Sequence, residues 1–368
     1  MNKTLIWMVK SSLVTPTKKN FEELLSKSDL YDVSTVDKTS KEYVKAEREI
    51  RKTAKLGYSI LTYPDSHYPA CLREISNPPA ILYVRGNISV LNGIVYAGIV
   101  GSRKCDNYGI QMASNIAREV GYTGAGVVSG GATGVDAAAH DGALRAKAPT
   151  VAVLGCGVDV NYPQPNKELF ERIVESGGAI ISEFPLGTRP WSNNFPKRNR
   201  IIAAMSTAVV LARAGRRSGG LITVNQAMSM NKTVFAVPGN IDSPLSIGAN
   251  ELIRDGALPL LNPMDLIDEL IVKNPDYFIR EKEKPQFETQ VPQVPDETVT
   301  KTEVKTVLSE YEREVVSIIE NGFTTQNLIE EKISFDPTRL TALLGMMEIK
   351  GIIKKKADKS YIIIGGKC

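Results

Sequence analysis

Short, wholly apolar segments alternate with helical stretches through the middle of the chain. The apolar segments are IVYAGIV at 94–100, GVVSG at 126–130, TVAVLG at 150–155, AIISEF at 179–184, TAVVLA at 207–212 and TVFAVPG at 233–239. Continuous apolar runs are typical of strands covered on both faces, and stretches such as YGIQMASNIAREVG would supply the covering helices. The pattern predicts an α/β fold with a doubly wound parallel sheet.

The segments before this core have a different pattern. Residues 1–57 mix short apolar clusters with Lys, Glu and Ser, and KEYVKAEREIRKTAKLG at 41–57 has helical spacing that ends at a glycine. We therefore predict a small helical N-terminal domain over 1–57. From 58 to 90 several prolines interrupt the pattern, which indicates a connector packed on the core. We predict that this connector and the core together form one domain over 58–272.

The C-terminal quarter of the chain begins with a change in composition. Residues 273–306 are rich in Pro, Lys, Glu and Thr and poor in periodic apolar residues, which predicts a linker. Residues 307–368 then show three helical stretches and a terminal strand pair, the order of a small winged helix-turn-helix domain. Such domains bind either DNA or proteins, and the sequence leaves both open.

Composition narrows the class of protein. The chain has 368 residues, 42% of them hydrophobic, and a formal net charge of +4. No apolar run reaches the roughly 18 residues that cross a bilayer, and no secretory cleavage pattern is visible, so we expect a cytoplasmic protein with no membrane contact. Four separated cysteines and two histidines predict neither a disulfide framework nor a metal site.

Three motifs follow apolar segments of the core: GSR at 101–103, SGGATGVDAAAH at 129–140 and FPKRNRII at 195–202. Right-handed crossovers bring the loops after parallel strands to one edge of a sheet, so these motifs should lie together. In the first, backbone N–H, hydroxyl and guanidinium groups can bind a phosphate, and Asp106 or Asn107 can cap the helix that follows. The sequence therefore predicts a phosphate-binding edge.

The second motif contains Asp136 and His140 four residues apart on one helix face. They could form an acid/base pair, but no nucleophile or third orienting group accompanies them. We therefore interpret them as groups that orient the loop, and predict no catalytic residue and no enzyme. The absence of GxxxxGK[ST], and of GxGxxG after the first strand, argues against ATP-driven and dinucleotide chemistry, and we predict no cofactor.

The third motif places Lys197, Arg198 and Arg200 beside Phe195. Several cations in succession suit a chain of phosphodiesters, and an aromatic ring suits unpaired bases, so single-stranded DNA is the predicted ligand. Phe195 could equally belong to the core. A further glycine turn, RRSGGLITVNQA at 216–227, enters a helix at the same predicted edge.

These motifs, together with VAVLGCGVDVNYPQPN, ISEFPLG, SGGLIT, VFAVPG and GANELIRDGA, closely resemble the bacterial DNA-processing protein A family (DprA/Smf) over about 58–263. The resemblance implies a Rossmann-like core that binds and protects single-stranded DNA, forms a homodimer, and helps to load the recombinase RecA during natural transformation. The positions that match the family are Gly101, Ser102, Arg103, Ser129, Gly130, Gly131, Lys197, Arg198, Asn199, Arg200, Ser218 and Gly219.

Two features leave alternatives open. Arg213 stands where relatives have an acid, and it could either strengthen the positive field or replace an ion pair. A related branch, the cytokinin-activating phosphoribohydrolases, would place its PGGxGTxxE turn on 218–226. There Gln226 occupies the position of the catalytic Glu, and an amide cannot act as a general base, although Glu183 could substitute.

Overall fold

A sheet of nine strands organises the first of the two units into which the chain divides, Met1–Gln286 and Phe287–Cys368. The computed structural model describes residues 3–283, 310–333, 340, 344, 347, 352–356 and 360–363. The strands are β1 Ser59–Thr62, β2 Ile81–Gly86, β3 Tyr96–Gly101, β4 Gly126–Ser129, β5 Thr150–Val153, β6 Ala179–Ser182, β7 Ala208–Arg213, β8 Thr233–Ala236 and β9 Leu258–Pro259.

The strand order is β1-β2-β6-β5-β4-β3-β7-β8-β9. All pairs from β6 to β9 are parallel, whereas β1 and β2 are antiparallel to their neighbours. The chain runs outward from β3 to β6 and then returns to β7 on the other side of β3. The structure thus shows a mixed α/β fold with a large, mostly parallel sheet, and its direction of winding reverses between β3 and β7.

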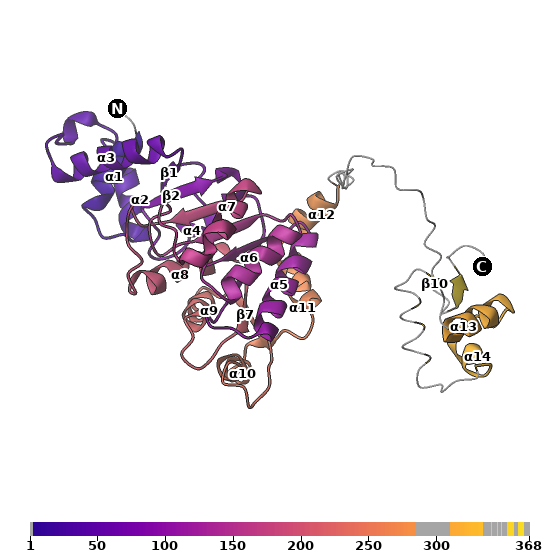
Figure 1. Cartoon of the computed structure of the whole chain (residues 1–368). Coiled ribbons are helices and arrows are strands. Elements are labelled where there is room, and N and C mark those ends of the chain that lie inside the picture. Colours follow the sequence, from indigo (N-terminus) through magenta and orange to yellow (C-terminus); the bar gives the residue numbers. More distant parts are fainter. Residues whose placement is uncertain are drawn as a thin grey trace, which may run out of the picture. The chain divides into compact units, whose positions relative to one another are not determined.

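Helices cover both faces of the sheet (Figure 1), and successive strand residues belong to opposite faces. In β3, Tyr96 and Val100 pack on one face while Ala97 and Ile99 pack on the other. This explains the unbroken apolar runs. The helices of this unit are α1 Lys3–Ser12, α2 Lys18–Ser26, α3 Lys41–Lys55, α4 Ala70–Arg73, α5 Asn107–Tyr122, α6 Val135–Arg145, α7 Lys167–Glu175, α8 Asn194–Met205, α9 Gly220–Ser229, α10 Ile247–Arg254, α11 Pro263–Lys273 and α12 Pro275–Glu283.

The N-terminal segment is helical, and its helices α1, α2 and α3 pack on the β1–β2 end of the sheet. Trp7 and Phe21 join an aromatic cluster with Tyr63 and Tyr68, in which the Trp7 and Phe21 ring centroids are 5.5 Å apart. The segment predicted as a connector contributes two strands that extend the sheet, because AILYVRG pairs with β6. The prolines lie between those strands rather than inside them.

The predicted linker begins too early. Helix α12 occupies the first part of it, and Tyr277 and Phe278 pack into the core. The Tyr277 hydroxyl also donates a hydrogen bond to the Gly124 carbonyl at 2.6 Å. Composition misled because Pro275 is the first residue of the helix, a position where proline is favourable. The rest of the predicted linker, up to residue 306, lies outside the described residues, which resume at Glu310.

The second unit contains α13 Glu310–Glu320, α14 Gln326–Glu330 and an antiparallel pair, β10 Ile353–Lys355 and β11 Tyr361–Ile363. Its core includes Val315, Ile329 and Leu344. The predicted third helix lies mostly outside the described residues, so the winged-helix assignment stays a prediction. Among the helices that the structure describes in either unit, none combines the length and apolarity needed to span a bilayer.

Candidate nucleic-acid interface

A cavity of about 560 Å³ opens where β3 and β7 end. Helix α5, which follows β3, covers one face of the sheet, and α9, which follows β7, covers the other, so a crevice forms between their first turns. Eight of the predicted site residues line this cavity: Gly101, Ser102, Arg103, Phe195, Arg198, Asn199, Ser218 and Gly219. The structure therefore brings together motifs that lie more than a hundred residues apart.

The first turns of three helices, α6, α8 and α9, contribute to the cavity wall. None of the three has a side-chain hydrogen bond at its N-cap. The first N–H groups of a helix have no partner within the helix and carry partial positive charge, which attracts anions. Some of these N–H groups already bond to the preceding backbone, as Val135 N–H does to the Ser102 carbonyl and Leu221 N–H to the Ser218 carbonyl. The three helix starts therefore add the positive ends of their dipoles to the potential of the side chains, rather than a full set of free donors.

The charged side chains of the cavity are mostly basic. Arg103, Lys104, Arg198 and Arg217 line it, against Asp136 as the acid among the described lining residues. Arg103 and Arg217 are exposed and belong to different loops, one after β3 and one after β7. The cavity is therefore suited to bind a polyanion.

Phe195 both packs against the protein and lines the cavity. Its ring lies 4.6 Å from the Arg103 guanidinium and 5.8 Å from the Tyr162 ring, between centroids, and the residue is half-buried. A Cβ at Gly155 would lie 2.9 Å from the ring, which shows how closely the two segments approach. The Arg103 guanidinium thus packs over the Phe195 ring in a cation–π contact, while part of the Phe195 surface remains accessible.

Arg198 is buried beneath the cavity rather than exposed in it. Its guanidinium donates a hydrogen bond to the Gly130 carbonyl at 2.6 Å, and burial lowers its pKa to about 10. Burial raises the pKa of Asp136, against the opposing effect of the nearby Arg198. A Cβ at Gly130 would lie 2.6 Å from Asp136 Oδ2 and 2.7 Å from Arg198 Nη2, so both side chains converge there.

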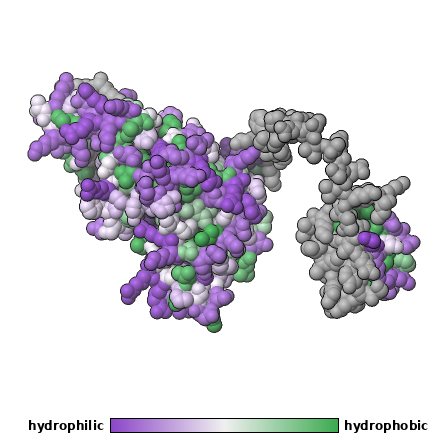
Figure 2. Space-filling view, in the orientation of Figure 1, coloured by the Kyte–Doolittle hydropathy of each residue, from purple (hydrophilic) through white to green (hydrophobic). Residues whose placement is uncertain are grey.

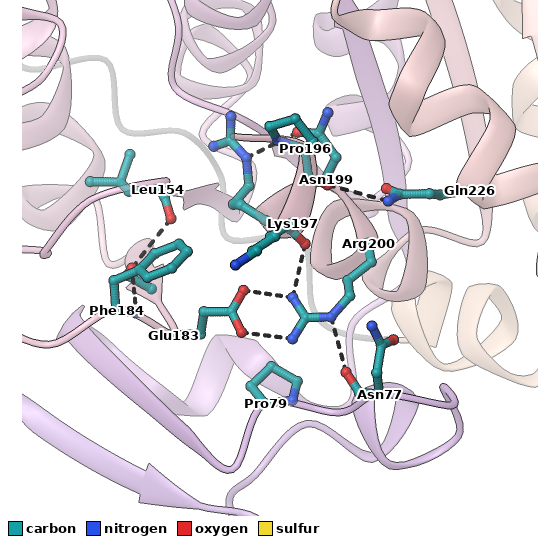
Figure 3. A network of polar contacts seen from close by, with 12 residues as sticks. Asn77, Pro79, Leu154, Glu183, Phe184, Pro196, Lys197, Asn199, Arg200 and Gln226 are labelled. Atoms are coloured by element: carbon teal, nitrogen blue, oxygen red, sulfur yellow. Dashed lines mark hydrogen bonds and ion pairs between the residues drawn. The ribbon is translucent and has the colours of Figure 1, made fainter. Parts of the chain in front are cut away.

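Arg200 points toward Glu183 and Asn77 (Figure 3) and does not line the cavity. Its guanidinium donates two hydrogen bonds to the Glu183 carboxylate, each at 2.6 Å, and a third to the Asn77 carbonyl at 2.9 Å. The side chain is 10% exposed. Lys197 is exposed but is not among the residues that line the cavity. The structure thus separates the three cations of the FPKRNRII motif into three environments.

The glycines of the second motif form a smaller hollow, of about 50 Å³, beside the main cavity. Gly130 and Gly131 line it together with Arg103 and Phe195. Ser129 is fully buried and its hydroxyl donates to the Ile99 carbonyl at 2.6 Å, so it fixes β4 to β3.

Arg213 forms the ion pair that the sequence left open. Its buried guanidinium pairs with Asp106 and donates to Ser243 at 3.0 Å and to Ser246. Asp106 also caps α5 by accepting a hydrogen bond from Gly109 N–H at 3.0 Å, as predicted. Because its charge is balanced and it is not part of the main cavity wall, Arg213 adds little to the positive field.

The groups needed for hydrolysis lie elsewhere. The Gln226 amide donates to the Pro196 carbonyl at 3.3 Å, and neither Gln226 nor Glu183 lines the cavity. His140 is fully buried, and its Nδ1 lies 2.8 Å from the Thr150 hydroxyl. Asp136 accepts a hydrogen bond from Ala132 N–H at 3.3 Å and so orients the loop. His140 bonds to β5 instead, so the two residues do not act as the pair that the sequence suggested. Within the described residues, no cluster of three potential metal ligands occurs.

Burial lowers the pKa of His140 to about 3, against about 6.5 in an unfolded chain. Below pH 6.5 the unfolded chain binds a proton that the folded protein excludes, so stability falls as the pH is lowered towards 3. We expect the free energy of unfolding, relative to a His140→Asn variant, to fall by about 2 kcal/mol between pH 7 and pH 5. Urea unfolding of both proteins at each pH measures this; parallel pH profiles would contradict it.

Sequence reasoning missed two parts of the wall. Tyr162 lies beside Phe195 in the long loop after β5. The signal that could have identified it is its place in the VNYPQP segment, which is part of a family motif. Arg217 lines the cavity and lies in the segment RRSGGLITVNQA, directly before the glycine turn for which that segment was singled out. Its position beside Ser218 is the signal that could have identified it.

The chain shows clear similarity to known proteins. Residues 59–271 match the family described as DNA recombination-mediator protein A. Protein Smf of Synechocystis sp. is 40% identical over 213 residues, which cover 57% of this chain and 53% of that protein. The DNA processing protein DprA of Bacillus subtilis is 33% identical over 235 residues, covering 64% of this chain and 79% of that protein.

Two solved structures are also similar. DNA processing protein A of Streptococcus pneumoniae superposes with a TM-score of 0.61 and 32% identity, covering 73% of this chain and 98% of that one. The protein of the same name from Helicobacter pylori, described for its single-stranded DNA binding mode, gives a TM-score of 0.53 and 31% identity over 59% of this chain and 96% of that one. The chain therefore belongs to the DNA recombination-mediator protein A family, a family of recombination mediators and not of enzymes.

Proposed function

We propose that the cavity between β3 and β7 binds the backbone of single-stranded DNA. The observation that carries the proposal is the convergence of Arg103, Lys104 and Arg217 with three uncapped helix starts around one open crevice. Such a site neutralises phosphates without reading base edges, so binding should depend on salt more than on sequence. Single-stranded DNA binding by the Helicobacter pylori protein supports the choice of ligand.

The predicted site residues take different roles in this proposal. Arg103 would contact phosphates directly. Gly101, Ser102, Ser218 and Gly219 would form the turns that shape the cavity, because the N–H groups of Ser102 and Ser218 already donate to the carbonyls of Arg213 and Gly215. Phe195 would support Arg103 and offer its accessible edge to a base. Arg198, Asn199 and Arg200 would act as positioning residues, since each is buried, and Lys197 would meet the DNA outside the cavity. Gly130 and Gly131 would shape the smaller hollow, and Ser129 would fix β4 to β3 beneath it.

The wider role proposed here follows the family. We infer that the protein acts in the cytoplasm as a homodimer, protects incoming single-stranded DNA and promotes RecA loading in natural transformation. The proposed domains are the helical 1–57, the Rossmann-like core 58–272 extended by α12, a linker up to 306, and a winged helix-turn-helix over 307–368. Two helices and a strand pair in the described part of the last segment support that assignment.

Replacing Arg103 with Ala tests the phosphate site. Hydrogen bonds to charged groups contribute about 1.5–3 kcal/mol, so we expect affinity for mixed-sequence single-stranded oligonucleotides to fall about ten- to hundredfold. The slope of log affinity against log salt concentration should also become shallower by about 0.7, the value for one phosphate contact on a single strand. Fluorescence anisotropy titrations at several salt concentrations measure both quantities.

Arg254→Ala is the matched control, because Arg254 is 71% exposed in the last turn of α10 and pairs with the exposed Asp255. It should leave affinity and salt slope unchanged. An Arg103→Ala protein that binds like the wild type, or a control that is equally weakened, would refute the assigned site.

A further inference from the structure

Helix α3 carries a line of five basic residues, Lys41, Lys45, Arg48, Lys52 and Lys55, spaced alternately four and three residues apart. All five are exposed. At 3.6 residues per turn this spacing keeps them within an arc of about 80° over a length of about 21 Å. We call this set the α3 stripe. The surface of the N-terminal helices that Figure 2 shows is largely hydrophilic.

The acidic residues of α3 do not neutralise the stripe. Glu47 pairs with Arg51, which lies off the stripe, at 2.9 Å. Glu49 is directed inward, with one carboxylate oxygen buried. Glu42 is displaced from the line by about 100° around the helix. Within the described residues, the ion pair that involves the stripe is that of Lys52 with Asp159, at 3.5 Å.

The stripe approaches the cavity at Lys52. Asp159 also accepts a hydrogen bond from Gly187 N–H at 2.7 Å, and a Cβ at Gly187 would lie 3.4 Å from Lys52 Nζ. Gly187 is only three residues before Pro190, which lines the cavity, so their Cα atoms are at most about 11 Å apart. Arg189, exposed, lies between them. The segment 187–190 thus joins the cavity wall to the Lys52 end of α3 and carries one exposed cation, Arg189, with Asp159 beside Lys52.

We propose that single-stranded DNA leaving the cavity continues past Arg189 and along the α3 stripe, which makes α3 a second DNA-contacting element. The inference rests on the proposed function of the cavity. A regular row of exposed cations on a helix, of which Lys52 has the ion pair noted above, suits the repeated charges of a nucleic-acid backbone and requires no base recognition. The stripe thus lengthens the binding site rather than creating a separate one.

Trp191 adds an aromatic surface to the same loop. It is 62% exposed although both of its neighbours, Pro190 and Ser192, line the cavity. Exposed rings beside a basic path can stack on unpaired bases. The chain has two tryptophans, and the other, Trp7, is fully buried, so quenching of the exposed fluorescence reports DNA at this loop.

The test replaces three stripe residues together, in the full-length protein, as Lys41→Gln, Lys45→Gln and Arg48→Gln. Glutamine favours helices, so α3 should remain folded, which circular dichroism checks. Binding is measured with labelled oligothymidylates of about 4 and about 20 nucleotides, the shorter matching the cavity alone. For the longer one we expect affinity to fall about tenfold and the salt slope to become shallower by about 2, with binding of the shorter one unchanged.

The matched control removes the same charge from exposed lysines outside the stripe, as Lys19→Gln, Lys27→Gln and Lys147→Gln. It should bind both oligonucleotides like the wild type, and both variants should retain the Trp191 quenching. Equal loss in the control, or an unchanged affinity of the stripe variant for the longer strand, would overturn the inference while leaving the cavity assignment intact. A wild-type protein that binds neither strand would overturn the cavity assignment itself.

Discussion

Replacing Arg198 with Met is expected to lower the free energy of unfolding by about 3–5 kcal/mol, although the residue lines the DNA-binding cavity. Stability falls because the substitution leaves a buried carboxylate and a buried carbonyl without the guanidinium. Asp136 is buried and its pKa is already raised by burial, with Arg198 the first of the opposing influences. Without the guanidinium, Asp136 has lost its nearest compensating charge and the Gly130 carbonyl has lost its donor. Urea unfolding at neutral pH measures the loss.

A second variant separates charge from packing. Arg198→Met combined with Asp136→Asn removes the stranded charge while keeping a side chain that can accept the hydrogen bond from Ala132 N–H. It should regain more than half of the lost stability, because replacing two opposite buried charges that influence each other costs far less than removing one of them. If the double variant is as unstable as the single one, the pair does not act as described.

Replacing Gly134 with Ala is expected to destabilise the protein by about 3 kcal/mol and to weaken DNA binding more than tenfold. Gly134 has φ 79° and ψ −126°, a conformation that side chains rarely adopt. A Cβ there would also lie 2.7 Å from the Arg103 carbonyl oxygen and closer still to that of Ser102. Since backbone atoms cannot rotate aside, the GSR turn itself must shift, and Arg103 with it.

Gly219→Ala is the control for this experiment. Gly219 also lines the cavity, but it has φ −62° and nothing within 4 Å of an added Cβ. Its free energy of unfolding should change by less than about 1 kcal/mol. Thermal unfolding and anisotropy titrations of both variants give the comparison, and a Gly134→Ala protein as stable as the control would show that the turn tolerates displacement.

The central strands could be predicted because a strand covered on both faces leaves an unbroken apolar run, as in β3 and β7. The pairing of β2 with β6 could not, because AILYVRG has no local feature that distinguishes a sheet strand from an extended connector. Helix α12 was missed for the opposite reason. Its polar composition is that of a linker, and only the packing of Tyr277 and Phe278 against the core shows otherwise.

The sequence predicts which loops meet at the site, but it does not predict which of their cations are exposed and available to a ligand. Residues 197, 198 and 200 lie on one helix, where successive side chains diverge by about 100°, so they cannot all face one ligand. Which of them faces inward depends on acids supplied by other segments. Glu183 comes from the loop after β6 and Asp136 from α6, and neither is near α8 in the sequence.

The pair of hydrogen bonds between the Arg200 guanidinium and the Glu183 carboxylate has a consequence for ligand recognition. It joins α8, the end of β6 and the carbonyl of Asn77, three segments that are distant in the sequence. Helix α8 also carries Phe195 and Arg198, so their places are set when the chain folds. The conformational entropy of the α8 side of the cavity is therefore lost during folding and not on binding. A flexible DNA strand binds a preorganised surface, so that only the nucleic acid loses conformational entropy.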